Sequence, residues 1–552
     1  MEIRNFIKIY EKSFIENWDL PALTDYVTGK TMPYSDLATS IAKLHLFYET
    51  IGIKPGDKIA LCGKDSVNWV LIYMATVTYG AVIVPILAEF NPVDVTHIVN
   101  HSEAKMLFVS EAVWEPMEPD KLLNVRGVIR IDNITVLYER NGEEMISSLR
   151  QLTRRFRRAY PKGFTSENVS YISRDNSEVT EINYTSGTTG FSKGVMLTGQ
   201  NLAGNVCFGM ETMLHFRSSR ALAFLPLAHA YGCAFDMLTP LAVGSHVTLL
   251  GKTPSPRVLL KALAEVKPNL VICVPLILEK IYKNQILPMI SKGTMRWTLA
   301  VPLLDQYIYS KIRRKLIDAF GGEFEEVIVG GAPLNHEVEE FLHKIKFPFT
   351  VGYGMTECGP LISYSPWRKF KVGSSGRTLP DMEAMILSDD PERIPGEICV
   401  RGANVMKGYY KNPEATSAVM TADGWLKTGD MGTRTPDGTL YLRGRSKTMI
   451  LSASGQNIYP EEIEAKLNNM PFVAESLVVE RNGKLAALVY PDYEALDRFD
   501  VSVSDMDSTM ENIRKELNEL VAPYERIAKI ILMPNEFEKT PKRSIKRFLY
   551  TH

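Results

Sequence analysis

Apolar runs alternate with amphipathic stretches along much of the chain. Between residues 35 and 110 the pattern switches repeatedly between the spacing of helices and the short runs of strands. It returns between residues 221 and 330, where apolar runs are separated by helical patterns such as SPRVLLKALAEVK at 255–267. This alternation is typical of a layered α/β fold.

The uncharged segment 66–88 has two interpretations. It is long enough to cross a bilayer. Alternatively, Gly80 ends a buried helix, and the apolar residues after it form a short buried strand. Because GDKIALCG at 56–63 also has a strand pattern, we expect a strand–helix–strand unit rather than a membrane span.

The pattern changes in the last third of the chain. Short strands and turns near residues 380–445 predict a small β-rich subdomain. Beyond residue 447, helical patterns at 459–469 and 508–521 enclose strand patterns, which predicts a compact α+β unit. We therefore expect an N-terminal domain over 1–445, built of layered α/β subdomains and the β-rich subdomain, followed by a C-terminal α+β domain over 446–552.

Composition and charge narrow the class of protein. The 552 residues are 45% hydrophobic and 23% charged, which suits a large folded core in more than one domain. The net charge of −1 gives no general attraction to nucleic acid. Residues 1–19 lack the apolar core of a signal peptide, and the six cysteines form no CxxC pair. These features favour a reducing, cytoplasmic location for the protein. They argue against a zinc site and against a disulfide scaffold.

One basic run departs from this balance. Residues 150–162 read RQLTRRFRRAYPK. The run is either a solvated helix face or a patch that contacts the anionic inner face of a membrane.

The segment NYTSGTTGFSKGVML, at 183–197, combines small, hydroxylated and basic residues after a strand pattern. Gly187 and Gly190 allow tight turns that point backbone N–H groups inward. Lys193 supplies a point charge. Hydroxyl donors come from Thr185, Ser186, Thr188 and Thr189. An ordinary polar loop is the alternative, but this set predicts a polyphosphate site, with a spacing that differs from the Walker A loop.

This loop resembles the signature of the adenylate-forming acyl-CoA synthetases, which is close to YTSGTTGxPKGV. Ser192 stands in place of the usual proline, and Gly199 stands where the family often has histidine. Five further segments match in the same order: FLPLAHAYG at 224–232 (acyl pocket), GGAPL at 330–334 (adenine turn), GYGMTECGP at 352–360 (closing over ATP), GWLKTGDMG at 424–432 (ribose turn) and the hinge region 442–464. The resemblance covers nearly the whole chain.

The resemblance implies contacts with the nucleoside of ATP. Asp430 would accept bonds from both ribose hydroxyls, although it could instead cap its turn. Arg445 would donate to the same ribose. Tyr353, followed by Gly354, would stack on adenine. The edge of the base would be read by backbone groups near Gly331, Ala332 and Pro333.

A second group of residues is implied around the phosphates. Glu357 is a hard oxygen ligand suited to Mg²⁺, and the Thr185 hydroxyl would complete the metal's surroundings. Thr356 would donate to the α-phosphate, and Lys193 would neutralise charge. These assignments predict an Mg·ATP site.

The implied reaction has two halves. A carboxylate attacks the α-phosphate of ATP and displaces pyrophosphate, which gives an acyl-adenylate. The thiol of CoA then attacks the acyl carbon, which gives a thioester and releases AMP. The carboxylate is already ionised at neutral pH and needs no base, so catalysis is mainly positioning and charge neutralisation. His229 and Tyr231 would shape the carboxylate end of the acyl pocket, although His229 could be a plain core histidine.

The acid is expected to be a fatty acid. The apolar region 228–283 is most similar to the long-chain fatty acid branch and has no obvious partner for an amino acid's ammonium. Two alternatives stay open: an enzyme that loads an acyl group on a carrier protein, and a nucleotide- or acyl-binding homologue without turnover. The oligomeric state is open.

The hinge and the tail complete the expectations. Lys447 occupies the family's hinge position, and Gly455 would line the pantetheine tunnel of a mobile C-terminal domain. In the tail, the lysine that relatives use during adenylation falls on Ser544. Lys542 and Lys546 lie two residues to either side, within reach of the same face of an extended segment. We predict that one of them substitutes, with Lys542 favoured.

Overall fold

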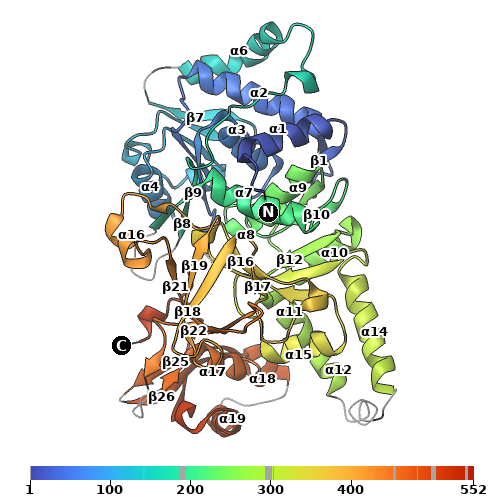
Figure 1. Cartoon of the computed structure of the whole chain (residues 1–552), viewed down its shortest axis with the longest axis vertical. Helices are drawn as coiled ribbons and strands as arrows, with labels where there is room; N and C mark the ends of the chain where they lie inside the picture. The colour runs from blue at the N-terminus through green and yellow to red at the C-terminus, as the bar shows by residue number, and fades with distance from the viewer. Residues whose placement is uncertain are drawn as a thin grey trace.

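The computed structural model describes residues 2–140, 142, 144–185, 193–291, 301, 304–451, 456–481, 483–498, 505–540 and 545–551. The molecule is elongated, with the blue and cyan elements at one end and the red C-terminal elements at the other (Figure 1). The predicted mixed α/β class is confirmed, because several sheets alternate with helices along the chain.

An eight-stranded sheet forms the first layer. Its central strands run parallel, and β7, β9 and β20 are antiparallel to their neighbours. In spatial order the strands are β20 (Gly408–Tyr409), β9 (Lys193–Thr198), β8 (Val179–Thr185), β4 (Val82–Ile86), β3 (Lys58–Cys62), β5 (Met106–Val109), β6 (Gly127–Arg130) and β7 (Thr135–Glu139). This order places the two strands that bracket the predicted phosphate loop beside a strand from far along the chain.

The uncharged segment 66–88 forms the helix and the second strand of a strand–helix–strand unit, as predicted. The helix α3 (Val67–Tyr79) begins where the Ser66 side chain accepts a hydrogen bond from the Trp69 amide. It ends at Gly80, whose φ of 85° is readily adopted only by glycine. The following β4 pairs in parallel with β3. Over the residues that the structure describes, no helix combines the length and apolar character needed to cross a bilayer.

Two smaller sheets extend the layered region. One has the order β10 (Arg220–Ala223), β11 (His246–Leu249), β1 (Pro21–Asp25) and β2 (Thr31–Pro33), and the other is parallel, with β12 (Leu270–Cys273), β13 (Glu326–Val329) and β14 (Phe349–Val351). The helices α10 (Pro256–Val266), α14 (Leu304–Ala319) and α15 (His336–Lys344) lie in the same region of the molecule (Figure 1). These elements confirm the alternation predicted for 221–330.

The predicted β-rich subdomain is also present. Its antiparallel sheet has the order β18 (Met382–Leu387), β19 (Gly396–Gly402), β21 (Leu426–Arg434) and β22 (Leu440–Arg445). A small sheet of β15 (Tyr353–Gly354), β16 (Leu361–Tyr364) and β17 (Arg377–Thr378) precedes it in the chain.

The C-terminal segment has its own core. The large apolar cluster runs from Phe6 to Leu440, whereas buried residues between Ile458 and Phe537 form two further clusters. They join the helices α17 (Pro460–Leu467) and α19 (Met506–Leu520) to the sheet of β25 (Val473–Arg481), β26 (Lys484–Pro491) and β27 (Lys529–Leu532). This is the predicted α+β arrangement.

The basic run lies on the helix α6 (Glu144–Ala159), near one end of the molecule (Figure 1). Its five arginines, Arg150, Arg154, Arg155, Arg157 and Arg158, are exposed, while Phe156 is buried. Both a solvated face and a lipid-facing patch require this exposure.

Candidate active site

The predicted phosphate loop joins two paired strands. Thr185 is the last residue of β8 and Lys193 the first of β9, and the two lie opposite each other in the antiparallel ladder. The sheet therefore fixes both ends of the loop. Five residues predicted within it, Ser186, Gly187, Thr188, Thr189 and Gly190, lie outside the described residues.

Lys193, Glu357 and Tyr409 form one side of the site, which we name the phosphate corner after its predicted ligand. The Tyr409 hydroxyl donates to Oε1 of Glu357 at 2.9 Å. The ammonium of Lys193 lies 4.9 Å from the centroid of the same ring, within the range of a cation–π contact. The predicted Lys193 and Glu357 thus meet through a residue that the sequence analysis did not single out.

The fold explains how Tyr409 reaches this place. The short strand β20 adds to β9, with Tyr409 opposite Val195, two residues after Lys193. Glu357 lies in the turn after β15, and its carbonyl accepts a hydrogen bond from the Met406 amide at 2.8 Å. Backbone pairing therefore holds all three side chains of the phosphate corner.

Tyr353, Asp430 and Arg445 form a second group, which we name the ribose corner after its predicted ligand. Tyr353 donates to Oδ2 of Asp430 at 2.8 Å, and Nε of Arg445 lies 3.2 Å from Oδ1. Asp430 and Arg445 are cross-strand partners in β21 and β22. Burial raises the pKa of Asp430, while the charge of Arg445 and the Tyr353 hydrogen bond oppose this rise. Both carboxylate oxygens therefore contact partners outside the Asp430 turn.

A narrow cavity of about 50 Å³ adjoins Tyr353 of the ribose corner. It brings together residues predicted for adenine and for the acyl group: Tyr353, Gly354, Gly331, Thr356, His229 and Tyr231 all line it. The two remaining residues of the predicted adenine turn, Ala332 and Pro333, are exposed beside Gly331.

The two residues predicted for the acyl pocket are held firmly. Nδ1 of His229 accepts a hydrogen bond from the Tyr231 amide at 3.3 Å, which fixes the ring at the start of a short turn. The Tyr231 hydroxyl donates to the Ile328 carbonyl at 3.1 Å. A Cβ at Gly330 would lie 3.0 Å from the Tyr231 ring, so glycine allows this approach. The pocket wall is thus attached to β13.

The hinge and tail residues follow both corners in the chain. Lys447 is exposed, two residues beyond Arg445. Gly455 and Lys542 lie outside the described residues. Lys546 pairs with Glu538 at 3.4 Å, and Arg547 pairs with Glu464 at 2.8 Å.

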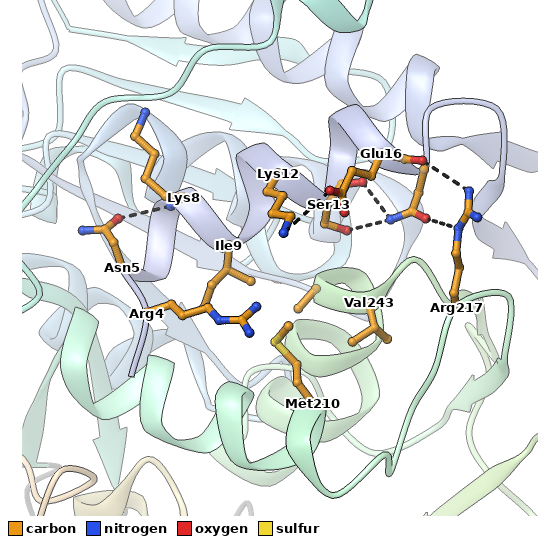
Figure 2. A pocket seen from close by; sticks show the side chains of 12 residues that line it. Arg4, Asn5, Lys8, Ile9, Lys12, Ser13, Glu16, Met210, Arg217 and Val243 are labelled. Carbon is orange, nitrogen blue, oxygen red and sulfur yellow. Dashed lines mark hydrogen bonds and ion pairs between the residues drawn. The ribbon is translucent and has the colours of Figure 1, made fainter. Parts of the chain in front are cut away.

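A larger pocket lies elsewhere, between the N-terminal helix α1 (Phe6–Glu16), α7 (Gly199–Glu211) and α9 (Thr239–Val243) (Figure 2). Its volume is about 660 Å³. Basic side chains line it, but Lys12 lies 3.7 Å from Glu16 and Nε of Arg217 donates to Asn17 at 2.8 Å. None of the predicted site residues contributes to its lining, so size alone does not locate the active site.

The sequence pattern of the AMP-binding enzyme family matches residues 11–410. The chain therefore belongs to the AMP-binding enzymes, the adenylate-forming superfamily that its motifs resemble. Several of its curated relatives are named as CoA ligases, so within that superfamily the chain groups with acid–thiol ligases.

Two curated relatives and one solved structure illustrate the similarity. A long-chain-fatty-acid–CoA ligase of Mycobacterium bovis is 29% identical over 562 residues, covering 93% of this chain and 89% of the relative. The 4-coumarate–CoA ligase 1 of Arabidopsis thaliana is 28% identical over 548 residues, with 96% and 88% covered. The crystal structure of an anthranilate CoA ligase with anthranoyl-AMP superposes with a TM-score of 0.79 at 19% identity, covering 100% of this chain and 97% of that one. The last comparison establishes the fold, and the two relatives differ in their acids.

Proposed function

We propose that the protein activates a fatty acid with Mg·ATP to acyl-adenylate and pyrophosphate, and then transfers the acyl group to CoA, releasing AMP. The observation that carries this proposal is the pair of corners. One presents a lysine and a glutamate and the other a buried aspartate, and a narrow cavity between β13 and β15 adjoins Tyr353 of the ribose corner. These are the residue types needed for phosphates with a metal and for a ribose.

The residues of the phosphate corner fit a magnesium ion. Glu357 is half-buried, and in the described part of the chain its Oε2 accepts no side-chain hydrogen bond. Mg²⁺ binds through one or two carboxylates and substrate phosphates and retains waters. Glu357, with the Thr185 hydroxyl, would hold it. When bound, Mg²⁺ neutralises phosphate charge, and Lys193 adds a second positive charge to the same group.

The remaining roles follow from position. Thr356 would donate to the α-phosphate, and His229 and Tyr231 would bound the carboxylate end of the acyl site. Neither His229 nor Tyr231 has to remove a proton from the acid, because the acid is ionised at neutral pH. The work of the protein is to hold the carboxylate and the α-phosphate together and to neutralise their repulsion.

We further propose that residues 446–552 form a mobile domain that turns about Lys447 between the two half-reactions. The separate core of this segment supports independent motion. Its described contacts with the N-terminal region include hydrogen bonds, such as the one from Lys283 to the Val473 carbonyl at 2.8 Å. Gly455 would line the path of the pantetheine arm, and Lys542 would replace the tail lysine.

The choice of a fatty acid rests on the Mycobacterium bovis relative and on the apolar segment around His229. A cytoplasmic location, with α6 against an anionic membrane, would bring the enzyme to a substrate that partitions into lipid. Loading of a carrier protein is the competing acceptor. The serine at 544, where the family has a lysine, is the reason to test the third candidate, a binding homologue without turnover.

Product analysis tests the proposal. The protein should convert a fatty acid, Mg·ATP and CoA to acyl-CoA, AMP and pyrophosphate, most efficiently for long chains in a series from acetate to stearate. Formation of ADP and phosphate would contradict it. If hydroxylamine traps an activated acyl group while CoA gives no thioester, the carrier-loading alternative gains. If ATP and acid bind without turnover, the protein is a binding homologue.

A further inference from the structure

Two consecutive tyrosines make parallel sets of contacts. The Tyr409 hydroxyl donates to Glu357, and the Tyr410 hydroxyl donates to Glu103, each at 2.9 Å. A lysine ammonium also lies near each ring: Lys193 at 4.9 Å from Tyr409 and Lys411 at 5.4 Å from Tyr410.

The two sets differ in how the lysine meets the carboxylate. Lys411 pairs directly with Glu103 at 2.9 Å, so charge is compensated at the Tyr410 site. Lys193 has no carboxylate partner among the described residues, and Tyr409 stands between it and Glu357. Tyr409 therefore separates a lysine from a glutamate, whereas Tyr410 does not.

This separation has a chemical consequence. A direct Lys193–Glu357 ion pair would satisfy each charge with the other, and phosphate and metal would have to break the pair. The face of an aromatic ring attracts an ammonium without accepting its protons in strong hydrogen bonds. Lys193 is thus kept near the site with its donors available, and Glu357 keeps its negative charge.

Tyr409 is itself rigidly placed. Its side chain is buried, and its amide donates to Oγ1 of Thr416 at 2.9 Å. The amide of the next residue, Tyr410, donates to the carbonyl of Gly194 at 2.7 Å, directly beside Lys193. Burial, and then the charge of Glu357, raises the pKa of Tyr409. Its hydroxyl therefore remains a donor at neutral pH.

We propose that Tyr409 is a positioning residue for Mg·ATP: its hydroxyl orients the Glu357 carboxylate toward the metal, and its ring holds Lys193 near the phosphates without neutralising either group. This inference rests on the proposed function, because it assumes that Glu357 and Lys193 serve Mg·ATP. The inference adds a physical reason why Tyr409 lies between Lys193 and Glu357.

The test is calorimetric binding of ATP to the full chain without fatty acid, first with Mg²⁺ and then with EDTA. Tyr409→Phe removes the hydroxyl and keeps the ring. We expect it to lose about tenfold in affinity for Mg·ATP, the size of one hydrogen bond to a charged group, and little in affinity for metal-free ATP. Tyr409→Leu removes the ring as well and should weaken both. Tyr410→Phe is the matched control and should change neither.

A thermal melt of each variant separates binding from folding, and Tyr409→Phe keeps the test valid if Tyr409→Leu does not fold. Wild-type affinities in Tyr409→Phe under both conditions would overturn the inference, as would an equal loss in Tyr410→Phe. If wild-type protein binds Mg·ATP no better than metal-free ATP, the metal role within the proposed function fails as well. If Mg²⁺ raises the affinity for ATP by the same factor in the wild type and in Tyr409→Phe, only the inference about Tyr409 fails.

Discussion

The two corners of the site hold a carboxylate in different ways. At the ribose corner, Asp430 lies in direct ionic contact with Arg445 at 3.2 Å and also accepts from Tyr353. At the phosphate corner, Glu357 accepts from Tyr409, and Lys193 lies over that tyrosine rather than against the carboxylate. The charge of Asp430 is thus compensated by an ion pair with Arg445, whereas Glu357 and Lys193 are kept apart.

The difference matches the two predicted ligands. A ribose is neutral, so it needs hydrogen-bond acceptors and donors but no net charge, and the buried Asp430 is stabilised by Arg445 without loss of function. A polyphosphate is strongly negative, so the lysine must be free to contact it, and charge-assisted hydrogen bonds are the strong ones. Changes at the phosphate corner should therefore cost more than changes at the ribose corner.

The largest effect is expected at Lys193. Lys193→Met should slow pyrophosphate release by on the order of ten- to a hundredfold, because a lost contact to a charged group costs about 1.5–3 kcal/mol. Lys411→Met is the matched control, since Lys411 also lies near a tyrosine ring but pairs with Glu103. Similar rates in the two variants would remove the distinction between the corners.

The tail should supply a further cation to the phosphate corner. Lys542→Ala should slow adenylation by about tenfold or more and leave thioester formation from supplied acyl-adenylate unchanged. Lys546→Ala should matter less, because Lys546 pairs with Glu538 at 3.4 Å. If neither lysine matters and Ser544→Lys activates a silent protein, the chain is a binding homologue.

The hinge should act on one half-reaction only, because both corners precede it in the chain. Lys447→Pro fixes φ at that position. It should slow thioester formation by roughly tenfold, as for a hindered conformational step, and spare pyrophosphate release. Equal slowing of both steps would contradict the hinge assignment.

The ribose corner should respond more weakly. Asp430→Asn keeps an acceptor for Tyr353 and loses the charge. We expect the KM for ATP to rise by about fivefold, the size of roughly one hydrogen bond of 1 kcal/mol, with kcat little changed. The ratio of mutant to wild-type KM should fall toward one with 2′,3′-dideoxy-ATP. A ratio that persists with this analogue would mean that Asp430 does not read the ribose.

The smallest effect on catalysis is expected far from both corners, on α6. Arg158→Gln should leave kinetics with dissolved substrate unchanged. It should weaken sedimentation with anionic vesicles at low salt by about fivefold, because each basic residue at such a surface contributes about 1 kcal/mol. Unchanged vesicle binding, also after reversal of the charges of the whole run, would identify α6 as a solvated face.

Local patterns predicted much of this molecule. The helix that ends at Gly80, the strand that precedes the phosphate loop and the β-rich subdomain each depend on neighbouring residues, so periodicity and glycine placement were sufficient. Asp430 and Arg445 were assigned to the ribose through the family resemblance, and the pairing of β21 with β22 brings them into contact. Such elements can be found without knowledge of the rest of the fold.

The phosphate corner required the tertiary structure. Tyr409 reaches Lys193 because β20 pairs with β9 from more than 200 residues away along the chain, and pairing over that distance leaves no periodic signal. The segment GYYK at 408–411 has two adjacent tyrosines and gives no indication of which one faces the site. Alternation along a strand decides this, and it is known only once the strand has a partner.

The central claim is that a fatty acid carboxylate attacks the α-phosphate of ATP. Mass spectrometry of AMP formed from fatty acid labelled with ¹⁸O at both carboxylate oxygens tests it most directly. Attack places one labelled oxygen between carbon and phosphorus, and the thiol then breaks the carbon–oxygen bond, so each AMP should carry one ¹⁸O. AMP without label, or label recovered in inorganic phosphate beside ADP, would contradict the account.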